Sequence, residues 1–206
     1  MKSLIIENQY FASVYLFSIL YTSTNIKLEA CETYQKGSFR NRCFILGANG
    51  IIPLSIPLVE GRSQKKLITD VRISNETKWQ THHWKAIESS YKRSPWFEHY
   101  APELKSFYSQ KYDFLFDWNL ELFKWALKKI NMNSLHVGQT IDFNKSYDPD
   151  IYEDLRNQIR PSNFKNFNMK PYPQVFSDRF GFVSNLSIID LLMNTGKTAG
   201  NYLEKL

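Results

Sequence analysis

The N-terminal part of the chain alternates short apolar runs with polar breaks. Residues 4–6, Leu-Ile-Ile, predict a short buried strand, and residues 26–30 alternate apolar and polar positions as a second strand would. Between them, residues 11–21 are apolar or aromatic at every position except Ser13 and Ser18, which predicts a mostly buried helix. The order strand, helix, strand indicates one βαβ unit, whose crossover we expect to be right-handed.

A second pattern follows, in which the apolar runs 44–46 and 51–58 flank Asn49 and Gly50. Both turn residues tolerate positive φ, so this pattern predicts a β-hairpin. Pro53 and Pro57 indicate that the return strand lies at an edge or is interrupted. Residues 67–73 alternate and predict a further strand.

The pattern becomes helical after Asn75. Residues 79–91 predict one helix, which Pro95 stops. Pro102 favours a helix start, so the next helix is expected over residues 103–110. Residues 113–130 keep a helical period and predict the longest helix.

The C-terminal third is less regular. Residues 131–180 are rich in Asn, Pro and Asp, and they predict irregular structure with one short helix at 149–158. A last helix is expected over residues 186–194. Ser187 and Asp190 have the S-x-x-D spacing of a capping box, and Gly196 supplies the stop.

Together these elements predict a mixed α/β fold, with a β-rich N-terminal half (a βαβ unit and a hairpin) and a mostly helical C-terminal half. The chain shows no internal repeat and no linker, so we expect a single domain over residues 1–206. With 206 residues, 43% of them hydrophobic, it can build a core without staples. Aromatic residues make up 16%, more than such a core needs, so some should line a groove.

Charge narrows the class of partner. The net charge of +6 favours anionic partners such as nucleotide-sugars, phosphates, nucleic acid or an anionic membrane face. The chain contains no run of five Lys or Arg residues and no low-complexity basic arm, which argues against nucleic acid. A nucleotide-sugar or another small anionic molecule is the expected partner.

Cysteine usage and hydropathy predict the compartment. Cys31 and Cys43 form no CxxC pair, and no zinc-ligand spacing is present, so we expect a reduced protein without a metal site. Glu7 falls where the apolar core of a signal peptide would continue. The longest uncharged run, residues 8–26, mixes in polar residues and is no credible membrane span. A soluble cytoplasmic protein is expected. Neither a cofactor nor an oligomeric state follows from the pattern.

The strongest candidate binding segment is residues 34–43, which place Lys36, Arg40 and Arg42 around Asn41. Guanidinium groups bind carboxylate or phosphate bidentately, and a nearby Lys adds a point charge. Along a strand, Arg40 and Arg42 would share one face and Asn41 would take the other. The alternative interpretation is a basic turn that lies in solvent.

Further candidates are scattered along the chain. His83 shares a helix face with Trp79 and is the candidate general base, with His82 second; the alternative is a core-edge histidine satisfied by a carbonyl. Gln9 and Tyr10 follow the first strand, where ligand sites of α/β units gather. Gln174 has no obvious local duty. Arg62 and Arg93 are additional candidate cations, and the alternative for both is a solvated position on the surface. Cys43 is a candidate nucleophile, and the alternative is a buried strand cysteine. Glycine-rich phosphate loops and a GxSxG motif are absent.

Four blocks of this sequence resemble the WbqC-like protein family. They are residues 36–45, 50–57, the segment with Trp79, His82 and His83 that continues to 91–97, and the segment 172–196. The resemblance implies bacterial origin, an association with surface-polysaccharide (O-antigen-type) biosynthesis, and transfer of glycine or another acyl group to a sugar. It also implies a functional histidine near residue 83 and a Gln-Tyr loop followed by proline. Here Gln9 and Tyr10 fit that loop, whereas Ala12 stands where proline is expected.

Two hypotheses follow. In the first, the protein is a transferase in which Lys36, Arg40, Asn41 and Arg42 bind an anionic group, His83 is the base, and Gln9 and Gln174 orient the acceptor. In the second, it is a non-catalytic binding or scaffold protein of the same pathway. A deep pocket that joins Arg42, His83 and Gln9 would favour the enzyme, and a flat aromatic patch would favour the scaffold.

Overall fold

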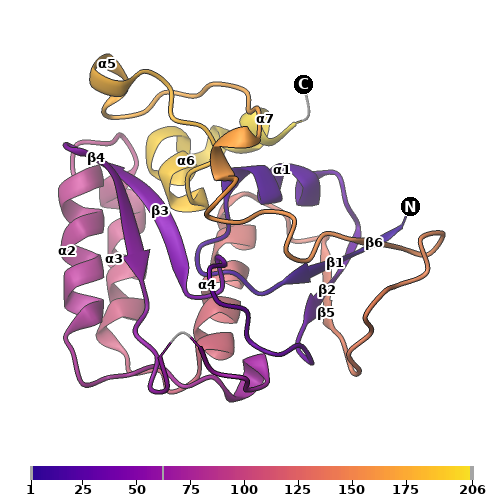
Figure 1. Cartoon of the computed structure of the whole chain (residues 1–206). Helices are drawn as coiled ribbons and strands as arrows, with labels where there is room; N and C mark the ends of the chain where they lie inside the picture. The colour runs from indigo at the N-terminus through magenta and orange to yellow at the C-terminus, as the bar shows by residue number, and fades with distance from the viewer. Residues whose placement is uncertain (1, 62, 205–206) are drawn as a thin grey trace.

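A computed structural model describes residues 2–61 and 63–204 of the chain. Its centre is a four-stranded parallel sheet with the order β5-β2-β1-β6, formed by β1 (Ser3–Glu7), β2 (Asn25–Glu29), β5 (His136–Gln139) and β6 (Tyr152–Asp154). The inner strands β1 and β2 pair in register from Leu4↔Ile26 to Glu7↔Glu29. Figure 1 shows β1 running from the N-terminus toward the middle of the molecule, so the carboxyl ends of the sheet point inward.

The helix α1 (Val14–Tyr21) connects β1 and β2, which confirms the predicted βαβ unit. Its first turn is capped by Ser13, whose hydroxyl accepts a hydrogen bond from the Leu16 amide at 3.3 Å. Leu4, Ile5 and Ile6 are all buried, as expected for an inner parallel strand covered on both faces.

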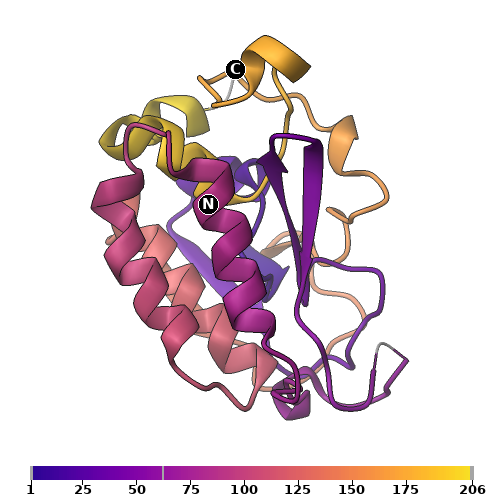
Figure 2. The ribbon, with the colours of Figure 1, turned by 90° about the vertical axis from the view of Figure 1, so that its left-hand side faces the viewer.

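The predicted hairpin is also present, formed by β3 (Arg42–Gly47) and β4 (Gly50–Ser55). These two strands form a sheet of their own, so Pro53 lies on an edge strand, where its missing amide hydrogen costs no ladder bond. Figure 2 shows the hairpin (purple) standing beside the three long helices. It packs against α2 and α6 and thereby links the helical layer to the C-terminal segment.

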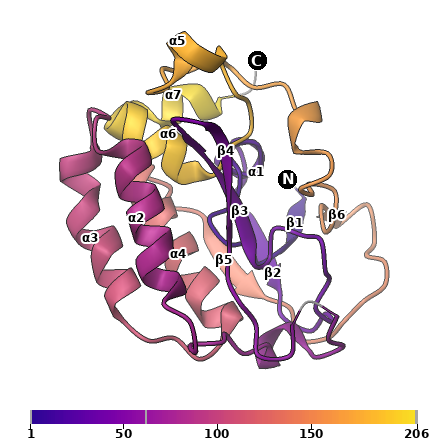
Figure 3. The same cartoon turned by 60° about the vertical axis from the view of Figure 1, so that its left-hand side comes forward.

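Three helices form one flank of the molecule: α2 (Trp79–Tyr91), α3 (Phe97–Ser109) and α4 (Leu115–Lys129). Figure 3 shows them side by side, on the far side of the hairpin from the loops that follow β5 and β6. The expected start of α3 at Pro102 is wrong, because Pro102 lies inside the helix. Phe97, Tyr100 and Leu104 are buried at helical spacing, and this packing holds the turns on both sides of the proline together.

The remaining elements are short: η1 (Ile68–Asp70), η2 (Phe164–Asn166), α5 (Ser177–Phe180), α6 (Ile188–Thr195), η3 (Gly196–Thr198) and α7 (Gly200–Leu203). The strand expected over 67–73 is therefore wrong, since a 3-10 turn occupies its centre and only isolated bridges flank it. The helix expected at 149–158 is also wrong, because Tyr152–Asp154 pairs with β1 as an edge strand. The mixed α/β class is confirmed, with two strands of the main sheet supplied by the second half of the chain.

Candidate functional site

Acidic residues end the inner strands of the parallel sheet. Glu7 closes β1 and Glu29 closes β2, the two are paired in register, and both are buried. Asp154 closes the neighbouring strand β6. Like charges held this close in the interior require cations or strong donors beside them.

Arg156 supplies one of these cations. Its Nη1 donates to Glu29 Oε2 at 2.7 Å, its Nε donates to Asp154 Oδ1 at 2.9 Å, and its Nη2 donates to Asp154 Oδ2 at 2.6 Å. The guanidinium group also lies over the rings of Phe143 and Tyr147, at 5.3 and 4.8 Å from their centroids. Arg156 thus ties the ends of β2 and β6 together.

Arg40 supplies the second cation, and its side chain is fully buried. It binds Glu32 bidentately, through Nε–Oε1 at 2.7 Å and Nη2–Oε2 at 2.5 Å, and its Nη1 donates to Asn157 Oδ1 at 3.0 Å. Burial raises the pKa of Glu32, against the lowering effect of Arg40. The expectation that Arg40 and Arg42 share one face is wrong, because Arg40 turns inward to Glu32 while Arg42 lies half-exposed at the start of β3.

Gln9 belongs to the same edge. Its Nε2 donates to Glu7 Oε1 at 2.8 Å, and Glu7 Oε2 accepts from the backbone amide of Asn157 at 2.9 Å. Within the described part of the chain, Gln9 Oε1 is buried without a hydrogen-bond partner. The loop after β1 therefore meets the loop after β6, as the position of Gln9 behind the first strand predicts.

Two pockets open at this edge. The sheet-edge pocket, of about 270 Å³, is lined by Glu32, Thr33, Gln35, Phe143, Lys145, Asp154, Arg156 and Asn157. The lysine pocket, of about 400 Å³, is lined by Thr33, Tyr34, Gln35, Lys36, Ser63, Gln64 and Lys65. They share Thr33 and Gln35. In the order β5-β2-β1-β6 the chain runs outward from β1 through β2 to β5 and then returns to β6 on the other side of β1, and ligands of open α/β sheets bind beyond the carboxyl ends of the strands at such a switch point.

The predicted base, His83, lies in a different place. Its Nδ1 is 3.0 Å from the Tyr10 hydroxyl, which lies 2.5 Å from the Tyr108 hydroxyl. Burial lowers the pKa of His83 from 6.5 to about 4, partly opposed by a hydrogen bond to the Ser55 backbone. The imidazole is therefore neutral near pH 7, with both nitrogens paired. This geometry favours the alternative of a core-edge histidine satisfied by a carbonyl; His82 is exposed on the same helix.

The other polar candidates are dispersed. Arg42 Nε donates to Ser55 Oγ at 3.0 Å across the hairpin. Asn41 is buried, where its Oδ1 accepts from the Tyr34 hydroxyl at 3.0 Å and its Nδ2 donates to the Ile56 carbonyl at 2.9 Å. Arg93 is exposed between α2 and α3, and Arg62 lies outside the described residues.

Gln174 belongs to a third group, centred on Asp190. Asp190 is buried in α6 and accepts hydrogen bonds from the hydroxyls of Tyr91 and Tyr172, both at 2.8 Å, and from Gln174 Nε2 at 2.9 Å. Burial raises the pKa of Asp190 to about 6. The predicted capping box is wrong: Ser187 makes no capping hydrogen bond through its side chain, and Asp190 points to the tyrosines instead.

The cysteines and the possible metal ligands are the last candidates. Both cysteines are free, and burial raises the pKa of the Cys43 thiol, so Cys43 is the buried strand cysteine of the alternative interpretation. Within residues 2–61 and 63–204, no three His, Cys, Asp or Glu side chains are grouped to hold a metal ion. No helix in the same ranges is long and apolar enough to cross a bilayer.

The sequence blocks and the geometry can be compared with known families. The model of the WbqC-like protein family matches residues 9–148 and 144–202. The chain belongs to the WbqC-like protein family. The searches matched it to no curated protein and no solved structure. All four blocks that carry the resemblance lie within the matched residues of this WbqC-like protein, and so do both pockets of the sheet edge.

Sequence reasoning missed four residues of the sheet-edge site: Glu29, Glu32, Asp154 and Arg156. A signal for Glu29 exists, because it closes a buried strand in the same way as Glu7 does. Asp154 and Arg156 were hidden because residues 149–158 were interpreted as a helix. Once β6 is seen as a strand, its end meets the ends of β1 and β2.

Proposed function

We propose that this WbqC-like protein binds a nucleotide-sugar, or a similarly anionic activated sugar, at the carboxyl edge of its parallel sheet, and that it acts in bacterial surface-polysaccharide (O-antigen or lipopolysaccharide) biosynthesis. The observation that carries the proposal is the pair of adjoining pockets beyond the switch point of the sheet. The pathway is the one that family resemblance implies.

The charges of the two pockets support an anionic ligand with a polar remainder. Lys36 and Lys65 are exposed in the lysine pocket, whose described lining contains no acidic residue. Phosphate or carboxylate binds there without repulsion. The sheet-edge pocket adds Lys145 and the amide of Asn157, together with the half-exposed ring of Phe143, on which a base or sugar can stack.

Arg40 and Arg156 have a different role in this proposal. Their guanidinium groups already bind Glu32, Glu29 and Asp154, so they position the pocket walls and leave the anion to the lysines. Freeing either one for a ligand would leave buried carboxylates unpaired, which costs several kcal/mol, on the order of 3–5. Of the predicted cluster, Lys36 is the residue that contacts the ligand in this proposal, since it lines the lysine pocket and is exposed.

A second candidate function is transfer of an aminoacyl or acyl group to the sugar, and Glu32 is the observation that favours it. Glu32 lines the sheet-edge pocket, and its raised pKa suits a general base. A sugar amine would attack the acyl carbonyl carbon, the bond to the leaving group would break, and the amine proton would pass to the Glu32 carboxylate. His83, buried and neutral beside Tyr10, would support the fold in this scheme.

Thermal unfolding with nucleotide-sugars tests the binding proposal. A ligand at 100 times its dissociation constant adds about 2.7 kcal/mol of stability. We expect a clear rise in melting temperature for wild type, and a loss of most of the rise in a Lys36→Ala/Lys65→Ala double variant. Both side chains are exposed, so the double variant should fold normally.

Arg93→Ala is the matched control, since it removes an exposed cation from a distant turn. It should leave the rise unchanged. The proposal is wrong if no nucleotide-sugar shifts the melting temperature of wild type, or if the lysine variant and the Arg93 variant respond alike. For the transfer reaction, product formation by wild type and its loss in Glu32→Gln are the expected results. Because Glu32→Gln also breaks the buried pair with Arg40 and should destabilise the protein, urea unfolding and retained nucleotide-sugar binding must show that the variant is folded under the conditions of the activity measurement.

A further inference from the structure

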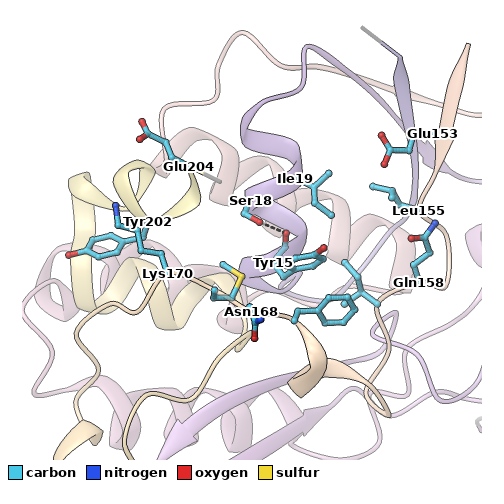
Figure 4. A pocket seen from close by; sticks show the side chains of 13 residues that line it. Tyr15, Ser18, Ile19, Glu153, Leu155, Gln158, Asn168, Lys170, Tyr202 and Glu204 are labelled. Carbon is cyan, nitrogen blue, oxygen red and sulfur yellow. Dashed lines mark hydrogen bonds between the residues drawn. The ribbon is translucent and has the colours of Figure 1, made fainter. Parts of the chain in front are cut away.

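A third pocket lies on the opposite side of the segment that follows β6. It has a volume of about 330 Å³, within the range of small-ligand pockets. Figure 4 shows its walls: Tyr15, Ser18 and Ile19 from α1, Glu153, Leu155 and Gln158 from the β6 segment, Asn168 and Lys170 from the following loop, and Tyr202 and Glu204 at the C-terminal end. We call it the α1 pocket.

The α1 pocket and the sheet-edge pocket share one wall. Along the chain from 153 to 158, Glu153, Leu155 and Gln158 line the α1 pocket, whereas Asp154, Arg156 and Asn157 line the sheet-edge pocket. A strand sends successive side chains to opposite faces, so β6 presents one pocket on each face. The two pockets are therefore separate sites.

The charge of the α1 pocket is opposite to that of the lysine pocket. Glu153 and Glu204 are exposed and form no ion pair in the described part of the chain. The cation of the lining, Lys170, already donates to the Asn201 carbonyl at 3.0 Å and lies over the Tyr202 ring. A phosphate or carboxylate would meet two carboxylates against the one ammonium group of Lys170, so the net charge of the lining disfavours anions.

The uncharged lining combines rings with unused polar groups. Tyr15 and Phe167 stack with their centroids 4.3 Å apart, and Tyr202 adds a third ring. Among the described residues, no hydrogen bond occupies the hydroxyls of Tyr15 and Tyr202 or the side-chain amide of Asn168. Hydroxyls and amides both donate and accept, which matches a ligand rich in hydroxyl groups that also has an apolar face.

We propose that the α1 pocket binds a neutral or amine-bearing saccharide unit, with its apolar face on the stacked rings of Tyr15 and Phe167 and its hydroxyls on Asn168 and the neighbouring polar groups of the lining. This inference extends the proposed function, because it adds a sugar site that is distinct from the anion site. Such a site would hold an acceptor sugar or a piece of glycan that lacks phosphate.

Titration of isotope-labelled protein by NMR tests the inference with three probes: N-acetylglucosamine, glucosamine and glucosamine 6-phosphate. We expect N-acetylglucosamine and glucosamine to bind with dissociation constants on the order of 1 mM and to change the chemical shifts of residues in the α1 pocket. The phosphorylated sugar should bind there at least about tenfold more weakly, because Glu153 and Glu204 repel its phosphate.

Two neighbouring asparagines give a matched pair of variants. Asn168→Ala removes an exposed amide of the pocket and should weaken sugar binding about tenfold, as the loss of one hydrogen bond predicts. Asn166→Ala removes an amide that is also exposed but lies outside the lining, and it should leave binding unchanged. Phe167→Ala should abolish binding through loss of the stacked ring.

Three outcomes would overturn the inference: no saturable binding of either phosphate-free sugar, equal binding of the phosphorylated sugar in the α1 pocket, or equal effects of Asn166→Ala and Asn168→Ala. Uridine diphosphate without a sugar separates this test from the previous one. If the diphosphate binds at Lys36 and Lys65 while no sugar binds near Tyr15, the α1 pocket inference fails and the proposed function stands.

Discussion

Arg40 and Arg42 lie two positions apart and have opposite environments. Arg40 is fully buried and held by a bidentate pair with Glu32, whereas Arg42 is half-exposed and bonded to the hydroxyl of Ser55. From sequence, both are cations of one basic segment. The difference comes from the loop after β2, which brings Glu32 into the interior beside the sheet. No local pattern in the sequence predicts this position of Glu32.

The same substitution at both positions measures the difference. Arg40→Lys keeps the charge but loses the planar fork on Glu32 and the hydrogen bond to Asn157, so it should destabilise the fold by about 3 kcal/mol. Arg42→Lys should change stability by less than about 0.5 kcal/mol. Urea unfolding of the two variants is the measurement. Similar losses of stability in the two variants would show that Arg40 does not form the buried pair with Glu32.

At the scale of elements, the sequence predicted those with long periodic patterns. The helix over 79–91 and the hairpin are confirmed, because the apolar period and the turn signal act within each element. The turn itself lies one residue earlier than expected, since Gly47 pairs with Gly50 and the residues Ala48 and Asn49 connect them. The edge strands β5 and β6 were missed. They are short, carry polar residues such as His136 and Glu153, and each pairs with only one neighbour, so their strand conformation depends on β2 and β1.

The end of α6 depends on Gly196 for two separate reasons. Gly196 has φ 55°, and a Cβ placed there would lie 2.0 Å from the ring of Trp96. Gly181, at the end of α5, has φ 66° and open space around it. Gly181→Ala therefore meets only the backbone strain of a left-handed residue, and Gly196→Ala meets that strain and a clash.

Gly196→Ala should thus lose about 2 kcal/mol more than Gly181→Ala, the usual cost of overpacking a well-packed contact. Denaturant unfolding measures both, and the Trp96 side chain is expected to change its fluorescence in the first variant alone. Equal losses for the two glycines would mean that Trp96 moves aside without cost.

At the scale of the whole molecule, two buried groups have pKa values shifted in opposite directions, and the stability of the fold depends on pH through both. The pKa of Asp190 is raised to about 6 in the folded state, so between pH 4 and 6 the folded protein keeps a proton on Asp190 that the unfolded chain releases. The contribution of this group to the free energy of unfolding is complete below about pH 4 and is lost as the pH rises through 6. The pKa of His83 is lowered to about 4, so its stability is present above pH 6.5 and is lost as the pH falls through 4. Between pH 4 and 6 the two effects oppose each other.

Asp190→Asn should remove the first effect. The unfolding free energy of this variant should then rise more steeply with pH between 4 and 6 than that of wild type, by about 3 kcal/mol across the window. Urea unfolding at several pH values provides the comparison, and Asp150→Asn, which changes an exposed carboxylate, is the control. A slope unchanged from wild type would contradict the raised pKa.

His83→Gln should remove the second effect. The variant lacks the group that takes up a proton on unfolding. As the pH decreases from 6.5 to 4, its free energy of unfolding should therefore fall less than that of wild type, and the difference between the two falls should be about 3 kcal/mol. The chemical shifts of the His83 ring in wild type report the same titration directly. A midpoint near 6.5 would show that the ring is hydrated and would restore His83 as a candidate base.

How much of the site could be predicted also differs with distance along the chain. Gln9 became a candidate because a strand end is a local signal, and Lys36 became one because cations cluster around it. Gln9 donates to Glu7, and the other partner of Glu7, the Asn157 amide, lies more than 100 residues along the chain; only the pairing of β6 with β1 brings it near. Tertiary pairing of this kind leaves no periodic trace in the sequence.

The order of the strands in the parallel sheet affects how this protein folds while the ribosome is synthesising it. Its inner strands β1 and β2 leave the ribosome first, but their outer partners β5 and β6 follow only at residues 136–154. Translation proceeds at roughly 5–20 residues per second, so the nascent chain carries two unpaired apolar strand edges for several seconds. During that interval Glu29 lacks its partner Arg156, and Glu7 lacks the hydrogen bond from the Asn157 amide. Chaperone binding to the ribosome-bound chain should therefore be greatest before residue 156 emerges, and a faster-translated stretch between β2 and β5 would shorten the exposure.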